Sequence, residues 1–159
     1  MATVVRILSE AGDYSRSRSG GGWRPGQFEE ELATGGLLAQ AFERGDVYLV
    51  RDAQDPVATV TLQWKDELHW PGASEDAGYV HRLAVAPDAH GRGIGRWLIE
   101  WAEDEARARE KRFLRLDTSA RNAVLRRYYE DAGFELRGEE AMEHWTVVLF
   151  ERAIRPRAQ

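Results

Sequence analysis

The sequence predicts one α/β domain, residues 1–159, with a mixed and mostly antiparallel central sheet flanked by helices. Two strand-like segments, Val47–Val50 and Val57–Trp64, are joined by the turn-like stretch DAQDP, which indicates a β-hairpin. A later strand-like segment, Tyr79–Val85, leads through a turn into an amphipathic run typical of a crossover helix. A length of 159 residues suits a single domain with a sizeable core.

The first part of the chain predicts a strand, a loop and two helices. Val4–Leu8 is apolar and is predicted as a first strand. Ser15–Gly22, with the sequence SRSRSGGG, is predicted as a flexible surface loop, or as a lid over a ligand, because serine and glycine resist packing. Helical patterns cover Pro25–Glu31 and Leu37–Arg44, and Gly45 is placed to cap the second of them.

The second part of the chain alternates helices and strands after a polar loop. In chain order we expect a loop over Lys65–Gly78, a helix over Ile94–Arg109, a strand over Phe113–Thr118, a short helix over Asn122–Ala132, and closing strands over Phe134–Arg137 and Trp145–Phe150. Asn122 is a plausible N-cap for the short helix, and Gly133 would end it.

The composition excludes several classes of function. The formal net charge of −5 opposes general affinity for nucleic acid, and no apolar run is long enough to predict a membrane span. The chain has no cysteine and no secretory signal pattern, so we expect a cytoplasmic protein without disulfides or thiolate zinc sites. The four histidines, His69, His81, His90 and His144, are scattered, so we expect no metal site.

Three alternating glycines, Gly91, Gly93 and Gly95, stand where the predicted helix begins. A dinucleotide fingerprint needs a further glycine at the sixth place, where Arg96 or Leu98 stands, depending on the glycine from which the count begins. A phosphate-binding P-loop needs Lys-Ser or Lys-Thr after the last glycine, and this chain has arginine and tryptophan there. Neither common nucleotide motif fits.

The chemistry of a glycine-rich helix start remains. The first turn of a helix has N–H groups without helical partners, and glycines let an anion approach them closely. Arg92 and Arg96 add cationic donors nearby. The segment therefore favours a bound phosphate or pyrophosphate, and the alternative is a turn that holds no ligand.

Two blocks of sequence resemble the acyl-CoA-binding core of the GNAT superfamily of N-acetyltransferases. The first is HRLAVAPDAHGRGIG, which has the family's Leu-x-Val strand at Leu83–Val85 and its glycine loop at His90–Gly95, with His90 in place of the usual Gln or Arg. The second is Asn122–Phe134, which carries the family's Asn…Tyr-Glu-x-x-Gly-Phe pattern. The resemblance covers roughly Val47–Phe150 and implies the GNAT fold, with a sheet that splays at the cofactor-binding strand.

The resemblance implies that acetyl-CoA is the acyl donor. In the family, the pantetheine arm pairs with the Leu-x-Val strand, and the pyrophosphate lies on the N–H groups of the glycine loop. The cofactor-binding residues it implies are Leu83, Ala84, Val85, His90, Gly91, Arg92, Gly93, Ile94, Gly95, Arg96, Asn122 and Tyr129. Asn122 would touch the cofactor, cap its helix, or do both.

The implied reaction is direct transfer of the acetyl group to a primary amine in a ternary complex. The amine must lose a proton, and family members often place a carboxylate base two residues before the Leu of Leu-x-Val, where this chain has His81. An imidazole with an ordinary pKa of about 6.5 suits that task. The alternatives are a structural histidine, or a water chain that ends at His81 or Glu75. The N–H of Val85 would polarise the thioester carbonyl.

The implied acid for the leaving thiolate is Tyr129, in the Tyr-Glu-x-x-Gly-Phe block. A tyrosine hydroxyl stays protonated at neutral pH because its ordinary pKa is about 10. Tyr128 lies about 100° away around the same helix, so one of the two rings can face the cofactor. The alternative is that both rings only pack beneath the sheet.

The acceptor is the least determined part of the reaction. Aromatic and acidic residues near the predicted acceptor region suggest a small cationic amine, and the candidates are Trp23, Trp64, Trp70 and Glu75. A homodimer could form through the C-terminal strand, around Trp145–Glu151. The competing interpretations are a silent acyl-CoA-binding domain that acts as a sensor or interaction module and, on the glycines alone, nucleotide-dependent catalysis.

Overall fold

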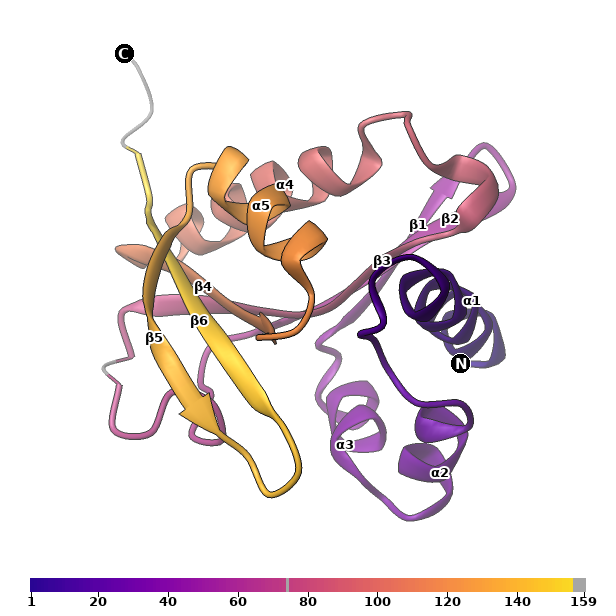
Figure 1. The fold of residues 1–159 in the computed structure, drawn as a ribbon. Helices are drawn as coiled ribbons and strands as arrows, with labels where there is room; N and C mark the ends of the chain where they lie inside the picture. The colour runs from indigo at the N-terminus through magenta and orange to yellow at the C-terminus, as the bar shows by residue number, and fades with distance from the viewer. Residues whose placement is uncertain (74, 156–159) are drawn as a thin grey trace. The chain divides into compact units, whose positions relative to one another are not determined.

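The computed structural model of the protein describes residues 1–73 and 75–155, so residue 74 of the predicted loop lies outside the described residues. Figure 1 shows the elements in chain order. They are α1 (Ala2–Ser19), α2 (Gln27–Ala33), α3 (Leu37–Arg44), β1 (Val47–Asp52), β2 (Asp55–Gln63), β3 (Ala77–Val85), the 3-10 helix η1 (Pro87–Ala89), α4 (Ile94–Ala108), β4 (Phe113–Ser119), α5 (Ala123–Asp131), β5 (Glu135–Ala141) and β6 (Thr146–Ala153).

The strands of the described chain hydrogen-bond in the order β1-β2-β3-β4-β6-β5. β3 and β4 run parallel, whereas β1–β2, β4–β6 and β5–β6 are antiparallel. The predicted mixed and mostly antiparallel sheet is therefore confirmed. One expectation is corrected: β6 has β4 on one edge and β5 on the other, so it has no open edge through which to pair with a second subunit. The homodimer itself stays a prediction.

The described chain forms two compact units, which we treat separately. The first contains Met1–Leu62 and Arg82–Leu98, and the second contains Gln63–His81 and the described residues from Ile99 onward. β3 and α4 each contribute their two halves to different units.

The first unit begins with a helix where the sequence predicted a strand. Val4, Val5, Ile7 and Leu8 are buried at the centre of the core of this unit. Successive members of this set are one, two and one positions apart in the sequence, which places them on a single face of a helix. Burial of that face outweighs the preference of β-branched residues for strands. The prediction of a strand over Val4–Leu8 is wrong.

The serine- and glycine-rich segment is also corrected. Residues up to Ser19 form the last turns of α1, and Gly20 ends that helix in a left-handed conformation with φ of 68°. The Ser15 hydroxyl donates a hydrogen bond of 2.7 Å to the carbonyl of Gly21. A flexible loop over Ser15–Gly22 is therefore not what the chain forms, because the helix cap and this hydrogen bond order it.

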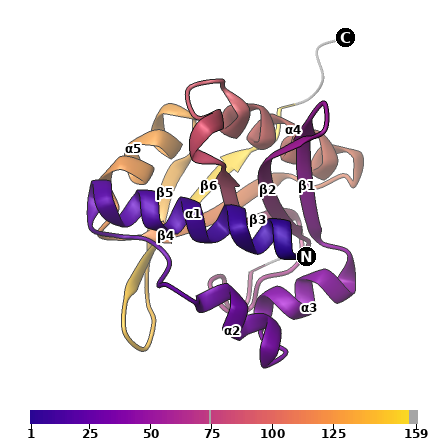
Figure 2. The same cartoon turned by 90° about the vertical axis from the view of Figure 1, so that its right-hand side faces the viewer.

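The helices α2 and α3 agree with the sequence, and Glu31 ties them to the end of β3. One carboxylate oxygen of Glu31 accepts a hydrogen bond from the N–H of Leu38, at the start of α3, over 2.9 Å. The same oxygen lies 3.1 Å from a guanidinium nitrogen of Arg82. Gly45 ends α3 with φ of 75°, as predicted. In Figure 2, α2 and α3 lie together beneath α1.

The second unit packs the rest of α4 and α5 against β4, β6 and β5. Arg152 of β6 joins both helices, because its guanidinium pairs with Glu103 of α4 and donates to the carbonyl of Ala132 at the end of α5 over 2.8 Å. The Asn122 side chain accepts from the N–H of Leu125 at 3.1 Å, which confirms the predicted N-cap. Gly133 follows the helix with φ of 84°.

A buried ion pair crosses the strands of the second unit. Arg115 of β4 donates from Nε to Glu151 of β6 over 2.8 Å, and from a second nitrogen to the hydroxyl of Tyr79 on β3 over 3.0 Å. Both charged side chains are almost fully buried, so each supplies the partner that the other needs. Among the described residues, no helix is both long and apolar enough to cross a membrane.

Candidate active site

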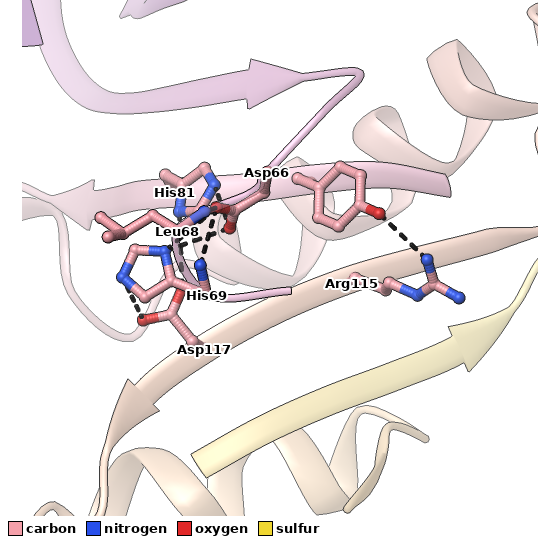
Figure 3. A network of polar contacts seen from close by, with 7 residues as sticks. Asp66, Leu68, His69, His81, Arg115 and Asp117 are labelled. Atoms are coloured by element: carbon pink, nitrogen blue, oxygen red, sulfur yellow. Dashed lines mark hydrogen bonds and ion pairs between the residues drawn. The ribbon is translucent and has the colours of Figure 1, made fainter. Parts of the chain in front are cut away.

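His81, at the end of the β3 segment in the second unit, is enclosed by polar side chains from two other elements. Asp117 lies on the neighbouring strand β4, and Asp66 and His69 lie in the loop between β2 and β3. Figure 3 shows the two imidazoles and the two carboxylates pointing toward one another. We call Asp66, His69, His81 and Asp117 the His–Asp ring.

Each imidazole of the ring contacts both carboxylates. Asp66 Oδ2 lies 3.1 Å from His81 Nε2 and 3.1 Å from His69 Nδ1. Asp117 lies 3.5 Å from His81 Nδ1 through one oxygen and 3.8 Å from His69 Nε2 through the other. Histidine and aspartate thus alternate around a closed circuit, in which the contacts of Asp66 are the shorter ones.

The two carboxylates determine the charge of His81. Burial alone would lower its pKa, but hydrogen bonding and the negative charges of Asp117 and Asp66 outweigh burial and raise the pKa of His81 to about 9. Burial would likewise raise the pKa of Asp66, but hydrogen bonds from His69 and His81 hold it well below its usual range. His81 is therefore an imidazolium at neutral pH, and the ordinary pKa of 6.5 expected from the sequence does not apply to it.

Local backbone structure explains why these side chains meet. The β3–β4 register pairs Tyr79 with Arg115 and Val80 with Leu116, so His81 and Asp117 are the next residues along the two parallel strands. Asp66 folds the loop by accepting hydrogen bonds from the N–H groups of Leu68 and His69, at 3.1 and 3.0 Å. This turn brings the His69 ring to a centroid distance of 5.5 Å from the His81 ring.

The same four residues could also hold a metal ion, since one ligand atom from each lies within 4.8 Å of the others. The sequence-based view of the histidines as scattered is therefore wrong for His69 and His81. Each imidazole contacts a carboxylate through both of its nitrogens. This arrangement is compatible with proton sharing, and also with a metal on one nitrogen of each ring and a carboxylate orienting the other. The expectation that the protein needs no metal stays a prediction.

Tyr129, the predicted acid, is buried in α5 of the second unit. Its ring packs edge-on against Phe134 and Tyr128, with centroid distances of 5.9 and 5.4 Å, and tilted against Phe150 at 6.1 Å. Burial raises the pKa of Tyr129 above its usual value, and electrostatic interactions with Tyr128 and Asp117 add to the rise. The hydroxyl therefore stays protonated through the neutral range.

The glycine loop of the first unit has the backbone that anion binding needs. Gly91 and Gly93 have φ of 76° and 75°, and a Cβ added at either would meet no heavy atom within 4 Å. Ile94 is the first residue of α4, and the carbonyl of Gly93 accepts from the N–H of Trp97 over 3.0 Å. The N–H group of Gly95 therefore belongs to the first turn of the helix, where backbone N–H groups have no helical partner.

Some side chains around this loop form ion pairs or hydrogen bonds within the first unit. Arg92 pairs with Asp52 of β1. His90 donates from Nε2 to the carbonyl of Val85 over 3.0 Å, and its ring lies edge-on to Tyr14 at 4.6 Å. The backbone just before Leu83 is irregular, because Arg82 has φ of 50°, which is rare for a residue other than glycine. The Arg82 side chain forms an ion pair with Glu31. Ala84 is buried in the core of the first unit.

Each predicted substrate-binding residue has a local partner. Trp23 packs edge-on against Phe28 in the first unit, at 5.1 Å. In the second unit, Arg109 covers the ring of Trp64 at 4.3 Å, and Arg115 lies over Trp70 at 4.9 Å. Glu75 is exposed, and its carbonyl accepts from Lys111 Nζ over 2.6 Å. These contacts account for how the tryptophan rings pack, and the acceptor role stays a prediction.

A family model described as the acetyltransferase (GNAT) family matches residues 12–134, more than half of the chain. The chain belongs to the acetyltransferase (GNAT) family. An uncharacterized N-acetyltransferase of Bacillus subtilis is 28% identical over 160 residues, which is 96% of this chain and 84% of that protein. A mycothiol acetyltransferase of Beutenbergia cavernae is 37% identical over 93 residues, which is 58% of this chain and 29% of that protein.

Solved GNAT structures share the fold of this acetyltransferase. A GNAT-family protein of Desulfovibrio desulfuricans superposes with a TM-score of 0.72 at 19% identity, covering 97% of this chain and 92% of that one. The PaiA N-acetyltransferase of Thermoplasma acidophilum, solved with coenzyme A, gives a TM-score of 0.69 at 16% identity, covering 96% and 91%. At such identities the likeness concerns the fold alone.

Sequence reasoning about this GNAT chain missed three members of the His–Asp ring. The sequence places Asp66 and His69 in the predicted polar loop over Lys65–Gly78, and its patterns assign no role to Asp117. A signal was present for Asp117, because Arg115 and Asp117 are charged residues two apart that alternate with the apolar residues Leu114 and Leu116. The loop pair gave no such signal, since a short acidic loop usually lies in solvent.

Proposed function

We propose that this GNAT protein transfers the acetyl group of acetyl-CoA to the primary amine of a small cationic molecule, by direct attack in a ternary complex. The observation that carries the proposal is His81, enclosed by Asp66 and Asp117 in a chain of an acetyltransferase family. A histidine held by two carboxylates is the arrangement expected of a base and its orienting partners. A domain that only bound acyl-CoA would not require such a base.

Acetyl-CoA is the proposed donor, and the glycine loop fits its pyrophosphate. The left-handed glycines at 91 and 93 leave open space where a side chain would stand, and α4, with 15 residues, presents its positive end there. Acetyl-CoA supplies the activated acyl group when bound. Coenzyme A in the complex of the Thermoplasma relative accords with this choice of donor.

The proton balance defines what the residues must do. An ammonium substrate loses one proton before its nitrogen can attack and a second when the C–N bond forms, while the breaking C–S bond leaves a thiolate that takes up one proton. Each turnover therefore releases one net proton to solvent. We assign the first proton to Nδ1 of His81 in the molecules in which its imidazole is neutral, because its 3.5 Å contact with Asp117 is the looser one. Asp66, at 3.1 Å from Nε2, would orient the ring.

The charge of the ring supports a cationic acceptor. At neutral pH the positive charge of His81 offsets one of the two carboxylates. The His–Asp ring then carries a single net negative charge, not counting His69. An ammonium group is attracted to such a site, and its approach to Asp117 would replace part of the interaction that keeps the proton on His81. Trp70 and Glu75, in the same loop region as Asp66, remain proposed contacts of the acceptor.

The proposal is tested by the release of free thiol from acetyl-CoA in the presence of primary amines. The panel should include amino acids, polyamines, amino sugars and peptide N-termini, each with its N-acetyl product identified by mass. We expect turnover with at least one small cationic amine and none with the matching alcohols. Binding of acetyl-CoA without turnover on any amine would instead favour a sensor or interaction module.

Two matched glycine variants test the donor site. Gly93→Ala and Gly45→Ala both place an alanine at φ of 75° in open space, so both should lose about 1–2 kcal/mol of stability. Only Gly93→Ala should also weaken coenzyme A binding, by on the order of tenfold, which is about 1.4 kcal/mol. The measurement is the rise in melting temperature on addition of coenzyme A. Equal rises in the two variants would exclude the loop as the pyrophosphate site.

A further inference from the structure

The His–Asp ring contains a second imidazole for which acetyl transfer has no immediate use. We propose that the ring binds one divalent transition metal ion of the zinc class. Its ligands are His81 Nε2, His69 Nδ1 and Asp66 Oδ2, and Asp117 orients the two imidazoles without touching the ion. All four residues belong to the second unit. The site goes beyond the proposed function, which uses the metal-free ring.

The side chains of the ring are the ligand types that zinc takes in proteins. Two histidines and one carboxylate form a sufficient set of three protein ligands, whereas calcium and magnesium take oxygen ligands and gain nothing from imidazole. With neutral imidazoles, the two carboxylates bring two negative charges, which a divalent ion neutralises. The four side chains are only 6–16% exposed, so this neutralisation takes place where water screens the charges little.

The distances between the ligand atoms are those of a coordination shell. Ligands held about 2.0–2.1 Å from a tetrahedral zinc ion lie about 3.3 Å from one another. Asp66 Oδ2 lies 3.1 Å from His81 Nε2 and 3.1 Å from His69 Nδ1, close to two edges of such a tetrahedron. In the metal-bound form, the ion takes the place of the protons that the imidazoles share with this oxygen.

The backbone fixes Asp66 so that one of its oxygens faces both imidazoles. Oδ1 accepts hydrogen bonds from the N–H groups of Leu68 and His69, over 3.1 and 3.0 Å. The shortest contacts with the two rings are made by the other oxygen, Oδ2. A ligating carboxylate is normally oriented in this way, by hydrogen bonds to groups outside the coordination shell. Asp66 is therefore already placed as a ligand.

Asp117 faces the nitrogens that the ion would not use. Its two oxygens lie 3.5 Å from His81 Nδ1 and 3.8 Å from His69 Nε2. A histidine that binds a metal usually donates its other N–H to a carboxylate or carbonyl, which fixes the orientation of the ring. Each imidazole of the ring thus has one nitrogen for the ion and the other beside Asp117. The longer contacts of Asp117 assign it the orienting role, and the shorter ones of Asp66 assign it ligation.

Metal binding and acetyl transfer are alternative uses of the ring. His81 cannot ligate an ion and act as the base in the same molecule, so we expect a bound ion to inhibit acetylation. This consequence rests on the proposed function, whereas the metal site itself does not.

The site is tested by calorimetric titration of the full chain with ZnCl₂, after treatment with a chelator and removal of that chelator. We expect one zinc ion per chain, also counted by elemental analysis after dialysis. CoCl₂ should give the intense visible absorption of tetrahedral cobalt, and zinc should abolish it. Calcium and magnesium at the same concentration should not compete. A wild type that binds no zinc, or whose cobalt complex is not tetrahedral, overturns the proposal without any variant.

Three variants locate the bound ion. His69→Gln removes a ligand and should bind no zinc at concentrations that saturate the wild type. Asp117→Asn removes only the orienting charge and should weaken zinc binding by about 10–100-fold. His144→Gln changes an exposed histidine of the same unit and should bind zinc as the wild type does. Cooperative thermal unfolding without metal shows that each variant is folded. Zinc bound equally tightly by His69→Gln and the wild type would overturn the site.

The consequence for activity is measured as N-acetyl product by mass, because zinc also binds the thiol of coenzyme A. Zinc should inhibit the wild type and His144→Gln with the midpoint found for binding, and a chelator should restore both. Product formation unchanged at saturating zinc would overturn the competition between the ion and the base. A wild type that binds zinc but acetylates no amine, with or without the ion, would refute the proposed function and leave the metal site standing.

Discussion

Replacing His81 by glutamine is expected to lower kcat/KM for the amine by about 10²–10⁴-fold, the usual range for loss of a general base. Glutamine preserves the size of the side chain and can still donate a hydrogen bond to Asp66, so the loop should keep its fold. Binding of coenzyme A should not change, because the glycine loop is intact. The measurements are steady-state kinetics and the rise in melting temperature caused by coenzyme A.

The pH dependence of kcat/KM in the wild type tests the role of His81 as base more sharply. A base acts only when deprotonated, and with a pKa of about 9 roughly one His81 in a hundred is free at pH 7. At subsaturating amine, kcat/KM should therefore rise about tenfold per pH unit from 7 and level off near pH 9. A pKa near 6.5, as for an unperturbed histidine, would give a flat profile above pH 7.5 and would contradict the role of the two carboxylates.

The acceptor amine itself titrates in the same range, so the control is a change of substrate. An amine whose own pKa lies below 7 is already neutral over the whole profile. The rise toward pH 9 should persist with that amine if His81 is the base, and should disappear in His81→Gln. If the rise vanishes with the weakly basic amine in the wild type, the profile belongs to the substrate and His81 has no part in it.

The pH dependence of folding stability tests the raised pKa of His81 independently of activity. The pKa of His81 is higher in the folded protein than in the unfolded chain, so binding of the proton stabilises the fold. This stabilisation is fully present below about pH 6.5 and is lost as the pH rises through about 9. The melting temperature of the wild type should therefore fall between these values more than that of His81→Gln. This comparison needs no substrate.

Much of the fold followed from local patterns. Asn122 has the hydrogen-bonding side chain that begins a helix, and Gly45 and Gly133 have the freedom that ends one, so α3 and α5 were predicted at nearly their true bounds. The first helix was mistaken for a strand. Its residues Val4 and Val5 are β-branched, and only the burial of one helical face in the first unit decides their structure.

The candidate site was likewise predictable from the sequence only where it depends on local patterns. His81 was found because it stands at a fixed distance before the Leu-x-Val segment, and the glycine loop was found because its spacing is local. The pairing of His81 with Asp117 depends on the register of β3 and β4, two neighbouring parallel strands that are separated in the sequence by helix α4. The approach of His69 depends on a loop turn made by Asp66. Neither is encoded in a short pattern, and together they changed the pKa expected for the base.

Replacing Tyr129 by phenylalanine is expected to lower kcat by about 10²-fold, at the low end of the range for a general acid. The leaving thiol has an ordinary pKa of about 8.5, so its thiolate departs with moderate ease even without a proton. Burial has also raised the pKa of Tyr129, which makes the hydroxyl a reluctant donor, although one that is always protonated. Both effects keep the expected loss modest. The KM for acetyl-CoA should be nearly unchanged.

The neighbouring tyrosine supplies the matched control. Phenylalanine at 129 keeps the ring that packs against Phe134 and Phe150, so the free energy of unfolding should change by no more than about 1 kcal/mol. Tyr128→Phe removes a hydroxyl one step around the same helix and should keep kcat. If Tyr128→Phe loses activity and Tyr129→Phe does not, the acid is Tyr128, and the buried ring of Tyr129 serves only to pack α5 against the sheet. Full activity in both variants would mean that the thiolate leaves without help from either hydroxyl.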